Sequence, residues 1–521
     1  MHRRRLLRLA CGLAALPSSA VATLRADEPY VVPAEPPSAG DDSHQALRAF
    51  QQRLLARYGR YRDVPLDEKA EYFEWEMFRY HLTSFGQITG RAVMSDRPGV
   101  RPTSVPSRDT STWNGSVMAA LSFKYAVTKE PETLRRLAEL VRGMHLFFEV
   151  MERPGIMARA VHPERWPNDE HGPMKEYRAA DGRTWWYVDD PAKGGFNQIA
   201  GGYAALMMFA YADLPPDVQR LAHRDMTHMV LHLVGYRWKA TDKENRPTTY
   251  GDLTPIVATV GVPFNAQIAY EIVALGHAFP PDDPTHAEII HDEFHRLRTE
   301  HHCYYEDPRR HLICPQRVGG SPLIKGMNDR NHVTNAAFVG LMLELDEARR
   351  TKRPVDREFM YQLGRTMVHS MELLYDQRNA LCTFMWAGLT REASLLQVFA
   401  PDDWRSHQLR TAAALVDGVE QLRRFRLDRW WIGGRYEEKP DLQWCDAFRP
   451  DDSQWKVSPY MTFVATGPYF NEHYCAMDFL YAYWVARYFR LQDHVTLRQA
   501  HAAVLRPTPG LRTWPLEGVG P

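Results

Sequence analysis

The chain has 521 residues, of which 44% are hydrophobic and 25% are charged, as in an ordinary globular protein. Lysine plus arginine and aspartate plus glutamate both number 64, so the formal net charge is zero. Nucleic acids and anionic membranes favour proteins with a clear basic excess, and the balance argues against both as partners. Aromatic residues make up 12% of the chain. That content fits a large core and also fits aromatic platforms for sugar rings.

Residues 1–22 have the pattern of an export signal. A basic start is followed by a short apolar run and by the small residues Ala20 to Ala22. The run is too short to span a bilayer, and the segment from Arg3 to Leu7 resembles a twin-arginine signal. No later segment has the pattern of a transmembrane helix. We expect a bacterial protein exported to the periplasm or the medium, with no membrane insertion.

The mature chain divides into a linker, one large domain and a tail. Residues 23–45 are rich in proline and read as a linker, and residues 507–521 read as an irregular tail. Long helical patterns fill the domain at residues 46–506. The sequence therefore predicts an all-α domain.

The helical patterns are of two kinds. Segments 132–150 and 357–375 carry their apolar residues on one face, whereas segment 475–489 is apolar almost all round. One-faced helices lie at a surface and all-apolar helices lie inside. This difference predicts an outer and an inner layer, and the early helix at 67–85 is expected to belong to the outer one.

An asparagine recurs where apolar segments open. It stands in "WNG", "FNQ", "FNA", "TNA" and "FNE", at Asn114, Asn197, Asn265, Asn335 and Asn471. The interval is about 70 residues, and the last is about twice as long, which leaves room for a sixth unit with its helices in residues 391–422. We expect each asparagine to cap a helix. If the inner helices all start at one end of a ring, the five would converge on one opening.

Six units of paired helices resemble the (α/α)6 toroid of the six-hairpin glycosidase-like proteins. That superfamily includes glycoside hydrolases, sugar epimerases and, in related incomplete toroids, polysaccharide lyases. The resemblance covers most of the mature chain and rests on architecture and periodicity. It implies short loops or small β-hairpins at the rim and an aromatic-lined cleft at one end. The fold by itself does not fix the activity.

Carboxyl groups at predicted loop–helix junctions are candidates for glycoside hydrolysis, which needs two of them across the scissile bond. Asp329, in "KGMNDRNHVTN", and Glu472, in "GPYFNEHYCAMDF", rank first. We expect an exported glycoside hydrolase that acts on an oligo- or polysaccharide, because hydrolases are frequent on the complete rings that the chain resembles.

Elimination from a uronate needs a neutralising group for the carboxylate and a base for the proton. His332, His473 and Tyr474 are candidate bases, amides such as Asn331 stand beside them, and Arg159 is a candidate carboxylate clamp. A polysaccharide lyase is therefore an open alternative. A sugar epimerase and a non-catalytic glycan-binding or scaffold protein are further alternatives.

The predicted substrate-binding residues combine the recurrent asparagines with polar and aromatic side chains near them. They are Asp109, Trp113, Asn114, Arg159, His162, Trp185, Trp186, Asp189, Asn197, Asn265, Asn331, Asn335 and Asn471. The partner is expected to be a carbohydrate, and the oligomeric state is left open.

No metal and no cofactor are expected. Cys303 and Cys314 flank a segment that a disulfide would close into a hairpin, and nearby histidines also allow a metal site, but the spacing matches no zinc pattern. His291 and His295 stand one helical turn apart, and we expect them on an exposed helix face.

Overall fold

The computed structural model describes most of the chain between His44 and residue 500. The described residues are 44–93, 103–105, 109–165, 173–255, 264–299, 317–318, 321–322, 324–377, 379–390, 393–427, 472–493 and 498–500. The predicted export signal, most of the linker, the tail, the Cys303–Cys314 segment and Asn471 lie outside them. Among the described residues, no helix combines the length and the apolar character needed to cross a membrane.

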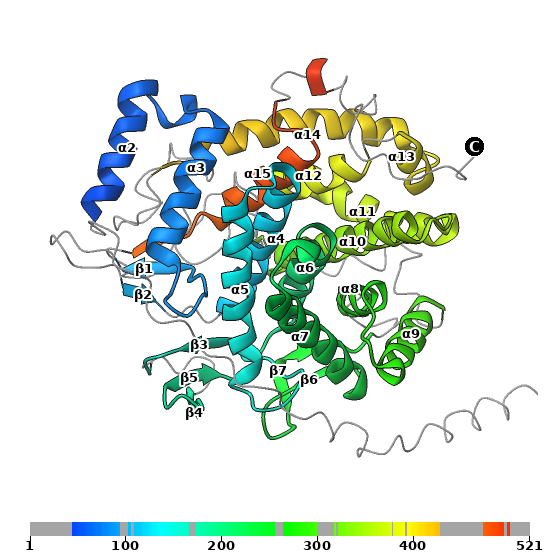
Figure 1. Ribbon diagram of the computed structural model, residues 1–521. Coiled ribbons are helices and arrows are strands. Elements are labelled where there is room, and N and C mark those ends of the chain that lie inside the picture. The colour runs from blue at the N-terminus through cyan, green and yellow to red at the C-terminus, as the bar shows by residue number, and fades with distance from the viewer. Residues whose placement is uncertain are drawn as a thin grey trace, which may run out of the picture.

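The structure is mostly helical, as predicted, and its most buried helices pack against one another. They are α4 (Thr110–Thr128), α6 (Lys193–Phe209), α8 (Phe264–Ala278), α10 (Ile324–Thr351), α12 (Ala380–Leu389) and α15 (Met477–Tyr488). Helix α4 packs on α6 and α15, and the contacts continue from α6 through α8, α10 and α12 to α15 (Figure 1). Helix α15 is buried from Met477 to Ala486, which confirms the all-apolar pattern.

A second set of helices packs on the outside of the first. It consists of α3 (Leu66–Glu76), α5 (Pro131–Glu149), α7 (Pro216–Gly235), α9 (Pro284–Thr299), α11 (Arg357–Gln377) and α14 (Trp404–Arg424). Helix α3 contacts α15, α5 contacts α4, α9 contacts α8, α11 contacts α10, and α14 contacts α12. In α5, Leu137, Val141 and Met144 are buried while Arg135 is exposed, as the one-faced pattern predicts.

The described residues also form further helical elements. They are α2 (His44–Tyr58), η1 (Tyr61–Asp63), the π-helical turn η2 (Met77–His81), η3 (Tyr211–Asp213) and α13 (Ala393–Phe399). The helix expected over 67–85 is α3 followed by η2, and the helical backbone ends at His81 because Leu82 is extended. His291 and His295 are exposed on α9, as predicted.

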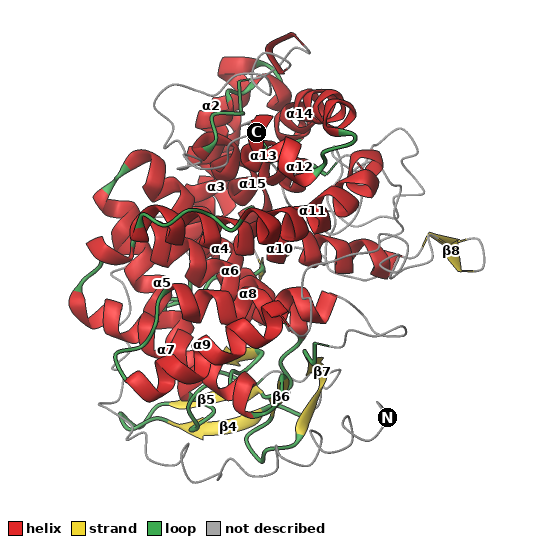
Figure 2. Ribbon diagram, turned by 90° about the vertical axis from the view of Figure 1, so that its right-hand side faces the viewer, coloured by secondary structure: helices red, strands yellow, loops and turns green. Residues whose placement is uncertain are grey.

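The described strands lie in segments that lead from an outer helix into the next inner one. They are β1 (Arg91–Val93), β2 (Thr103–Val105), β3 (Ala160–His162), β4 (Lys175–Arg178), β5 (Thr184–Val188), β6 (Lys239–Thr241), β7 (Pro247–Asp252), β8 (Arg317–Val318), β9 (Ser321–Pro322) and β10 (Glu472–Tyr474). They form antiparallel sheets in the orders β10-β1-β2, β3-β5-β4, β6-β7 and β8-β9. Strands β4 to β7 gather at one end of the helical body (Figure 2).

The expectation that the recurrent asparagines cap helices is wrong for Asn114, Asn197 and Asn335. Helices α4 and α6 begin about one turn before Asn114 and Asn197, at N-cap residues Asp109 and Ala192 whose side chains make no cap hydrogen bond. In α10, Asn335 stands several turns inside the helix. The helices extend through the preceding polar residues, so these amides are available for contacts with other elements.

Two further expectations about helix positions are corrected. The sequence predicts a loop–helix junction at the polar stretch "KGMNDRNHVTN", but α10 starts at Ile324 and includes the whole stretch. The sixth unit was placed at 391–422, which forms α13 and α14, whereas its inner helix is the earlier α12, buried from Ala380 to Leu389. The mostly apolar α12 is only 10 residues long, and periodicity does not identify so short an apolar run as a helix.

Glycines allow the backbones of α4 and α6 to touch. A Cβ atom at Gly115 would lie 2.3 Å from the carbonyl oxygen of Gln198, and a Cβ atom at Gly202 would lie 2.6 Å from the carbonyl oxygen of Gly115. Backbone atoms cannot rotate away as a flexible side chain can. The close packing of α4 on α6 therefore requires glycine at these positions.

We predict that Gly115→Ala lowers the free energy of unfolding by about 2–3 kcal/mol, because the methyl group must push two helix backbones apart. Gly235→Ala is the matched control, since a Cβ atom there has no neighbour within 4 Å, and it should be neutral or slightly stabilising. Urea unfolding followed by circular dichroism measures both. Equal effects of the two variants would contradict the close approach.

Candidate active site

The side-chain amide of Asn197, on α6, joins polar groups from two other inner helices. Its Nδ2 donates to Oε2 of Glu271 on α8, with a separation of 2.6 Å. Its Oδ1 lies 2.9 Å from Nδ1 of His332 and 3.4 Å from Nδ2 of Asn335, both on α10. Asn197 has no exposed surface, whereas His332 is partly exposed. The cluster therefore runs from the interior to a group that solvent reaches.

This arrangement fixes the tautomer of His332. An amide oxygen can only accept a hydrogen bond, so Nδ1 of His332 carries the proton that it donates to Asn197. In the neutral ring, the lone pair then lies on Nε2. Gly194 stands beside this atom, and a Cβ atom there would lie 3.0 Å from Nε2. The Asn197 amide thus holds the His332 ring so that its basic nitrogen, Nε2, lies beside Gly194.

Glu271 anchors the inner end of the cluster. The side chain is fully buried on α8, and burial raises the pKa of its carboxyl group well above the usual range, although the hydrogen bond from Asn197 lowers it in part. The carboxyl group is therefore protonated at pH values where an exposed glutamate is ionised. Oε2 of Glu271 accepts the Asn197 N–H, which leaves the amide oxygen of Asn197 toward His332.

A tyrosine from α15 completes the buried part. The hydroxyl of Tyr481 donates to Oδ1 of Asn335, with a separation of 3.2 Å. That contact orients the Asn335 amide so that its Nδ2 faces Asn197. Burial raises the pKa of Tyr481, so its hydroxyl keeps its proton. Helices α6, α8, α10 and α15 thus share one hydrogen-bonded network.

A lysine precedes Gly194, the residue that stands beside His332. Lys193 precedes Gly194 and stands one turn before Asn197 on α6. Its Nζ donates to Oδ1 of Asn265, with a separation of 3.0 Å. The Asn265 amide is itself held by the carbonyl oxygen of Asp252, at 3.0 Å. The ammonium group is therefore held by the Asn265 amide, and Lys193 is partly exposed.

Asn114 and Trp113 serve the fold near this cluster. Asn114 is fully buried; its Oδ1 accepts from the Ile88 N–H at 2.8 Å, and its Nδ2 donates to the Ile88 carbonyl at 2.9 Å. Trp113 is half-buried, and a Cβ atom at Gly90 would lie 2.9 Å from its Nε1. Both residues hold the segment before β1 against α4.

The predicted clamp Arg159 is committed to an ion pair. Its Nε and Nη2 donate to Oδ1 of Asp109 at 2.9 and 2.7 Å, and its Nη1 donates to the Asp190 carbonyl at 3.4 Å. His162 is buried on β3, where it accepts from the Glu164 N–H, and burial lowers its pKa. These residues tie the β3–β5–β4 sheet to the start of α4.

Trp185 and Trp186 stand on β5 and differ in exposure. Trp185 is 3% exposed and packs edge to face with Phe85, whereas Trp186 is half-buried with the Arg165 guanidinium 5.4 Å from its ring. Asp189 is ion-paired with Lys175, which also pairs with Glu244.

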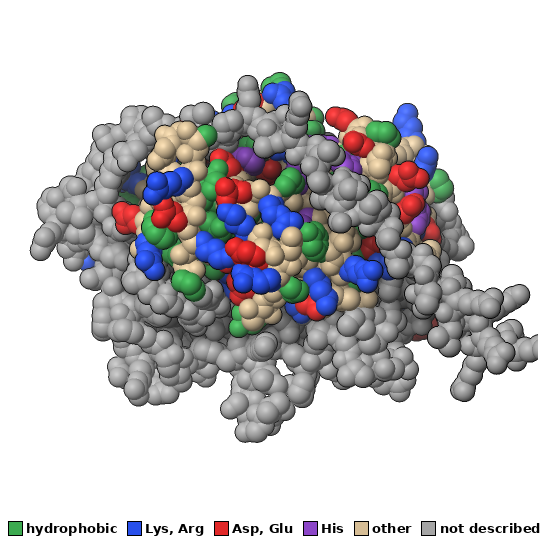
Figure 3. Space-filling view, turned by 90° about the horizontal axis from the view of Figure 1, so that it is seen from below, with side chains coloured by type: hydrophobic (Ala, Val, Ile, Leu, Met, Phe, Trp, Pro, Cys, Tyr) green, Lys and Arg blue, Asp and Glu red, His purple; other side chains and the backbone are tan. Residues whose placement is uncertain are grey.

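Acidic and basic side chains alternate over the described part of the face seen from below (Figure 3).

His473 lies in a different cluster from His332. It stands on β10 with no exposed surface, between Glu76 and His81. Asp329 and Asn331 lie in α10, and Glu472 and Tyr474 lie in β10, but their side chains are outside the described structure. Of the predicted site residues, the structure brings together Asn197, His332 and Asn335.

Sequence reasoning missed Glu271, Tyr481 and Lys193. A signal existed for Glu271, because it is the lone acidic residue in the apolar segment "NAQIAYEIVALGHAF" and an unpaired buried carboxyl is costly. Tyr481 and Lys193 gave none, since a tyrosine in an apolar helix and a lysine at a helix start are both ordinary.

Comparison with protein-family models, with curated proteins and with solved structures gives no match for this chain.

We predict that Glu271→Gln changes how stability depends on pH. The folded-state pKa of Glu271 is raised, so above pH ~4.5 the unfolded chain loses this proton first, and stability falls as pH rises toward the folded pKa. The wild type should lose up to about 1.4 kcal/mol per pH unit relative to Glu271→Gln in this window.

Urea unfolding at pH 5 and pH 8 tests this prediction. Exposed Glu288 on α9 provides the control Glu288→Gln, which should keep the wild-type pH dependence. A Glu271→Gln variant whose stability changes with pH as the wild type does would show that Glu271 is ionised in the folded protein.

Proposed function

We propose that the protein is an exported carbohydrate-active enzyme built as an (α/α)6 toroid. The circuit of contacts from α4 through α6, α8, α10, α12 and α15 back to α4 supports the toroid, as does the pairing of these helices with outer ones. The placement of the described strands before inner helices supports a rim at that end. The Asn197 cluster would then lie where such a rim leads into the ring.

We propose that His332 is the general base of this enzyme and that the reaction is elimination from a uronate-containing polysaccharide. The hydrogen bond from Nδ1 of His332 to Oδ1 of Asn197, at 2.9 Å, carries the proposal. A base must be oriented and must hold its lone pair on the atom that faces the substrate. Asn197 supplies both conditions, and Glu271 in turn fixes Asn197.

The chemistry follows from these positions. Nε2 of His332 takes the proton from the carbon next to the uronate carboxylate. The electron pair forms a carbon–carbon double bond, the bond to the leaving glycosidic oxygen breaks, and that oxygen takes up a proton. The ammonium group of Lys193 would neutralise the carboxylate and so stabilise the charge that develops in the transition state.

Hydrolysis is the second candidate, and the state of Glu271 favours it. A general acid must hold its proton at the working pH, and burial raises the pKa of Glu271 well above its usual range. A second carboxyl group would be needed across the bond, for which Asp329 and Glu472 are the predicted residues. Glu271 is completely buried, whereas a general acid must reach the substrate. The argument for hydrolysis is therefore weaker than the argument for elimination.

We predict that His332→Gln lowers kcat by about 10²–10⁴-fold on a uronate-containing polysaccharide, because the proton acceptor is removed. Reducing ends and the ultraviolet absorbance of an unsaturated uronate should be followed together. His291→Gln, at an exposed position on α9, should keep full activity.

The two signals separate the alternatives. Absorbance that rises with the reducing ends in the wild type supports elimination. Reducing ends without absorbance would instead establish hydrolysis. Full activity of His332→Gln would exclude His332 as the base.

We predict that Lys193→Met raises KM for the uronate polysaccharide by at least about ten-fold, because the variant loses one charge-assisted contact with the substrate carboxylate. A carboxyl-reduced form of the same polysaccharide is the control substrate, and the variant should leave its binding unchanged. An equal loss of binding to both polymers would assign Lys193 a structural role through Asn265.

A further inference from the structure

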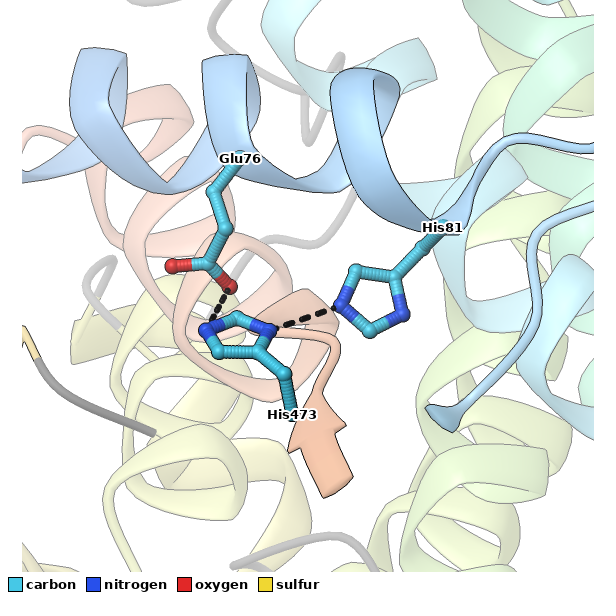
Figure 4. Close-up of side chains that lie close together, drawn as sticks. All are labelled: Glu76, His81 and His473. Atoms are coloured by element: carbon cyan, nitrogen blue, oxygen red, sulfur yellow. Dashed lines mark hydrogen bonds and ion pairs between the residues drawn. The ribbon is translucent and has the colours of Figure 1, made fainter. Parts of the chain in front are cut away.

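Glu76, His81 and His473 form a buried cluster that the proposed activity does not use. Nε2 of His81 lies 3.0 Å from Nδ1 of His473, and Nε2 of His473 lies 3.5 Å from Oε1 of Glu76 (Figure 4). One ligand atom from each residue can be chosen so that all three lie within 4.8 Å of one another. None of the three side chains has exposed surface.

A π-helical turn creates this cluster. Glu76 ends α3 and His81 ends η2, five residues later. In an α-helix, residues five apart point about 140° away from each other, whereas the wider π-helical turn brings them toward the same side. Such turns are rare in proteins, and those that occur are often found at functional sites. The third member comes from β10, which pairs with β1.

The hydrogen bonds of His81 leave its Nε2 lone pair directed at His473. Its Nδ1 lies 3.0 Å from the carbonyl oxygen of Thr89, and a carbonyl oxygen can only accept, so Nδ1 carries the proton. The lone pair of the neutral ring is then on Nε2, which faces His473. Metal-binding histidines usually donate their second N–H to a carbonyl or carboxylate in this way. The Thr89 N–H in turn donates to the His81 carbonyl, at 2.9 Å.

We propose that Glu76, His81 and His473 bind one divalent transition-metal ion. Two imidazoles and one carboxylate form a donor set that suits Zn²⁺ or Fe²⁺. In the metal-free protein, a proton lies in the contact between His473 and His81. The ion takes the place of this proton, which moves to Nε2 of His473, so both histidines bind as neutral rings. Nε2 of His473 then donates toward Oε1 of Glu76, which binds as a carboxylate. Metal–nitrogen distances of roughly 2.0–2.1 Å require only local shifts of these side chains.

The position of the cluster assigns the ion a structural role. Metal at this place would link the end of η2 to β10, between residues 392 positions apart in the chain. Helix α3 also packs on α15, which directly follows β10. Because all three ligands are buried, the ion is shielded from substrate and its loss should appear as lost stability. The inference departs from the expectation of no metal and does not depend on the proposed activity.

Metal analysis of the full mature chain tests the proposal. The protein should be purified without chelator, and about one Zn²⁺ or Fe²⁺ per chain is expected by elemental mass spectrometry. Removal with a chelator should lower the melting temperature, and addition of Zn²⁺ should restore it. Glu76→Gln, which keeps size and shape, should lower the Zn²⁺ affinity at least about ten-fold, as should His81→Gln.

The control is another buried histidine–carboxylate pair. Nδ1 of His145 lies 2.9 Å from the carboxylate of Asp225, and His145→Gln should leave the metal content unchanged. Wild-type protein that holds no metal and gains no thermal stability from Zn²⁺ would overturn the proposal. Zn²⁺ binding that is unchanged in folded Glu76→Gln and His81→Gln would overturn it as well.

Discussion

The amide of Asn197 is the contact on which the inner helices and the candidate active site both depend. It donates to Glu271 and accepts from His332 and Asn335, and Asn335 is held by Tyr481. Buried polar groups are costly unless they are satisfied, so the rotation of each helix must match the others. The same network that sets the register of α6, α8, α10 and α15 therefore orients His332.

This coupling lowers the free energy of unfolding. A carboxyl group in the interior resists ionisation, and a leucine or methionine at position 271 would avoid that problem. A glutamate there is explained if the network must present a base with a fixed tautomer, because functional sites commonly break local rules of stability. The close packing of α4 on α6 through Gly115 and Gly202 adds rigidity next to Asn197.

The sequence predicted the layers of the fold better than the site. Helical periodicity identified α5, α11 and α15, because long amphipathic or all-apolar segments give strong signals. The asparagine pattern located two members of the cluster, but it suggested helix caps, since a sequence cannot distinguish a cap from an amide that binds another helix. Glu76 and His81 went unnoticed because their proximity depends on a π-helical turn, which no periodic pattern encodes.

The central claim is that His332 and Lys193 face the substrate, and a crystal structure tests it most directly. The inactive His332→Gln variant should be crystallised with a uronate oligosaccharide. The account predicts a uronate ring beside residue 332 with its carboxylate in contact with the ammonium group of Lys193. An oligosaccharide bound elsewhere, or a carboxylate held by Arg159 with Lys193 still on Asn265, would contradict the account.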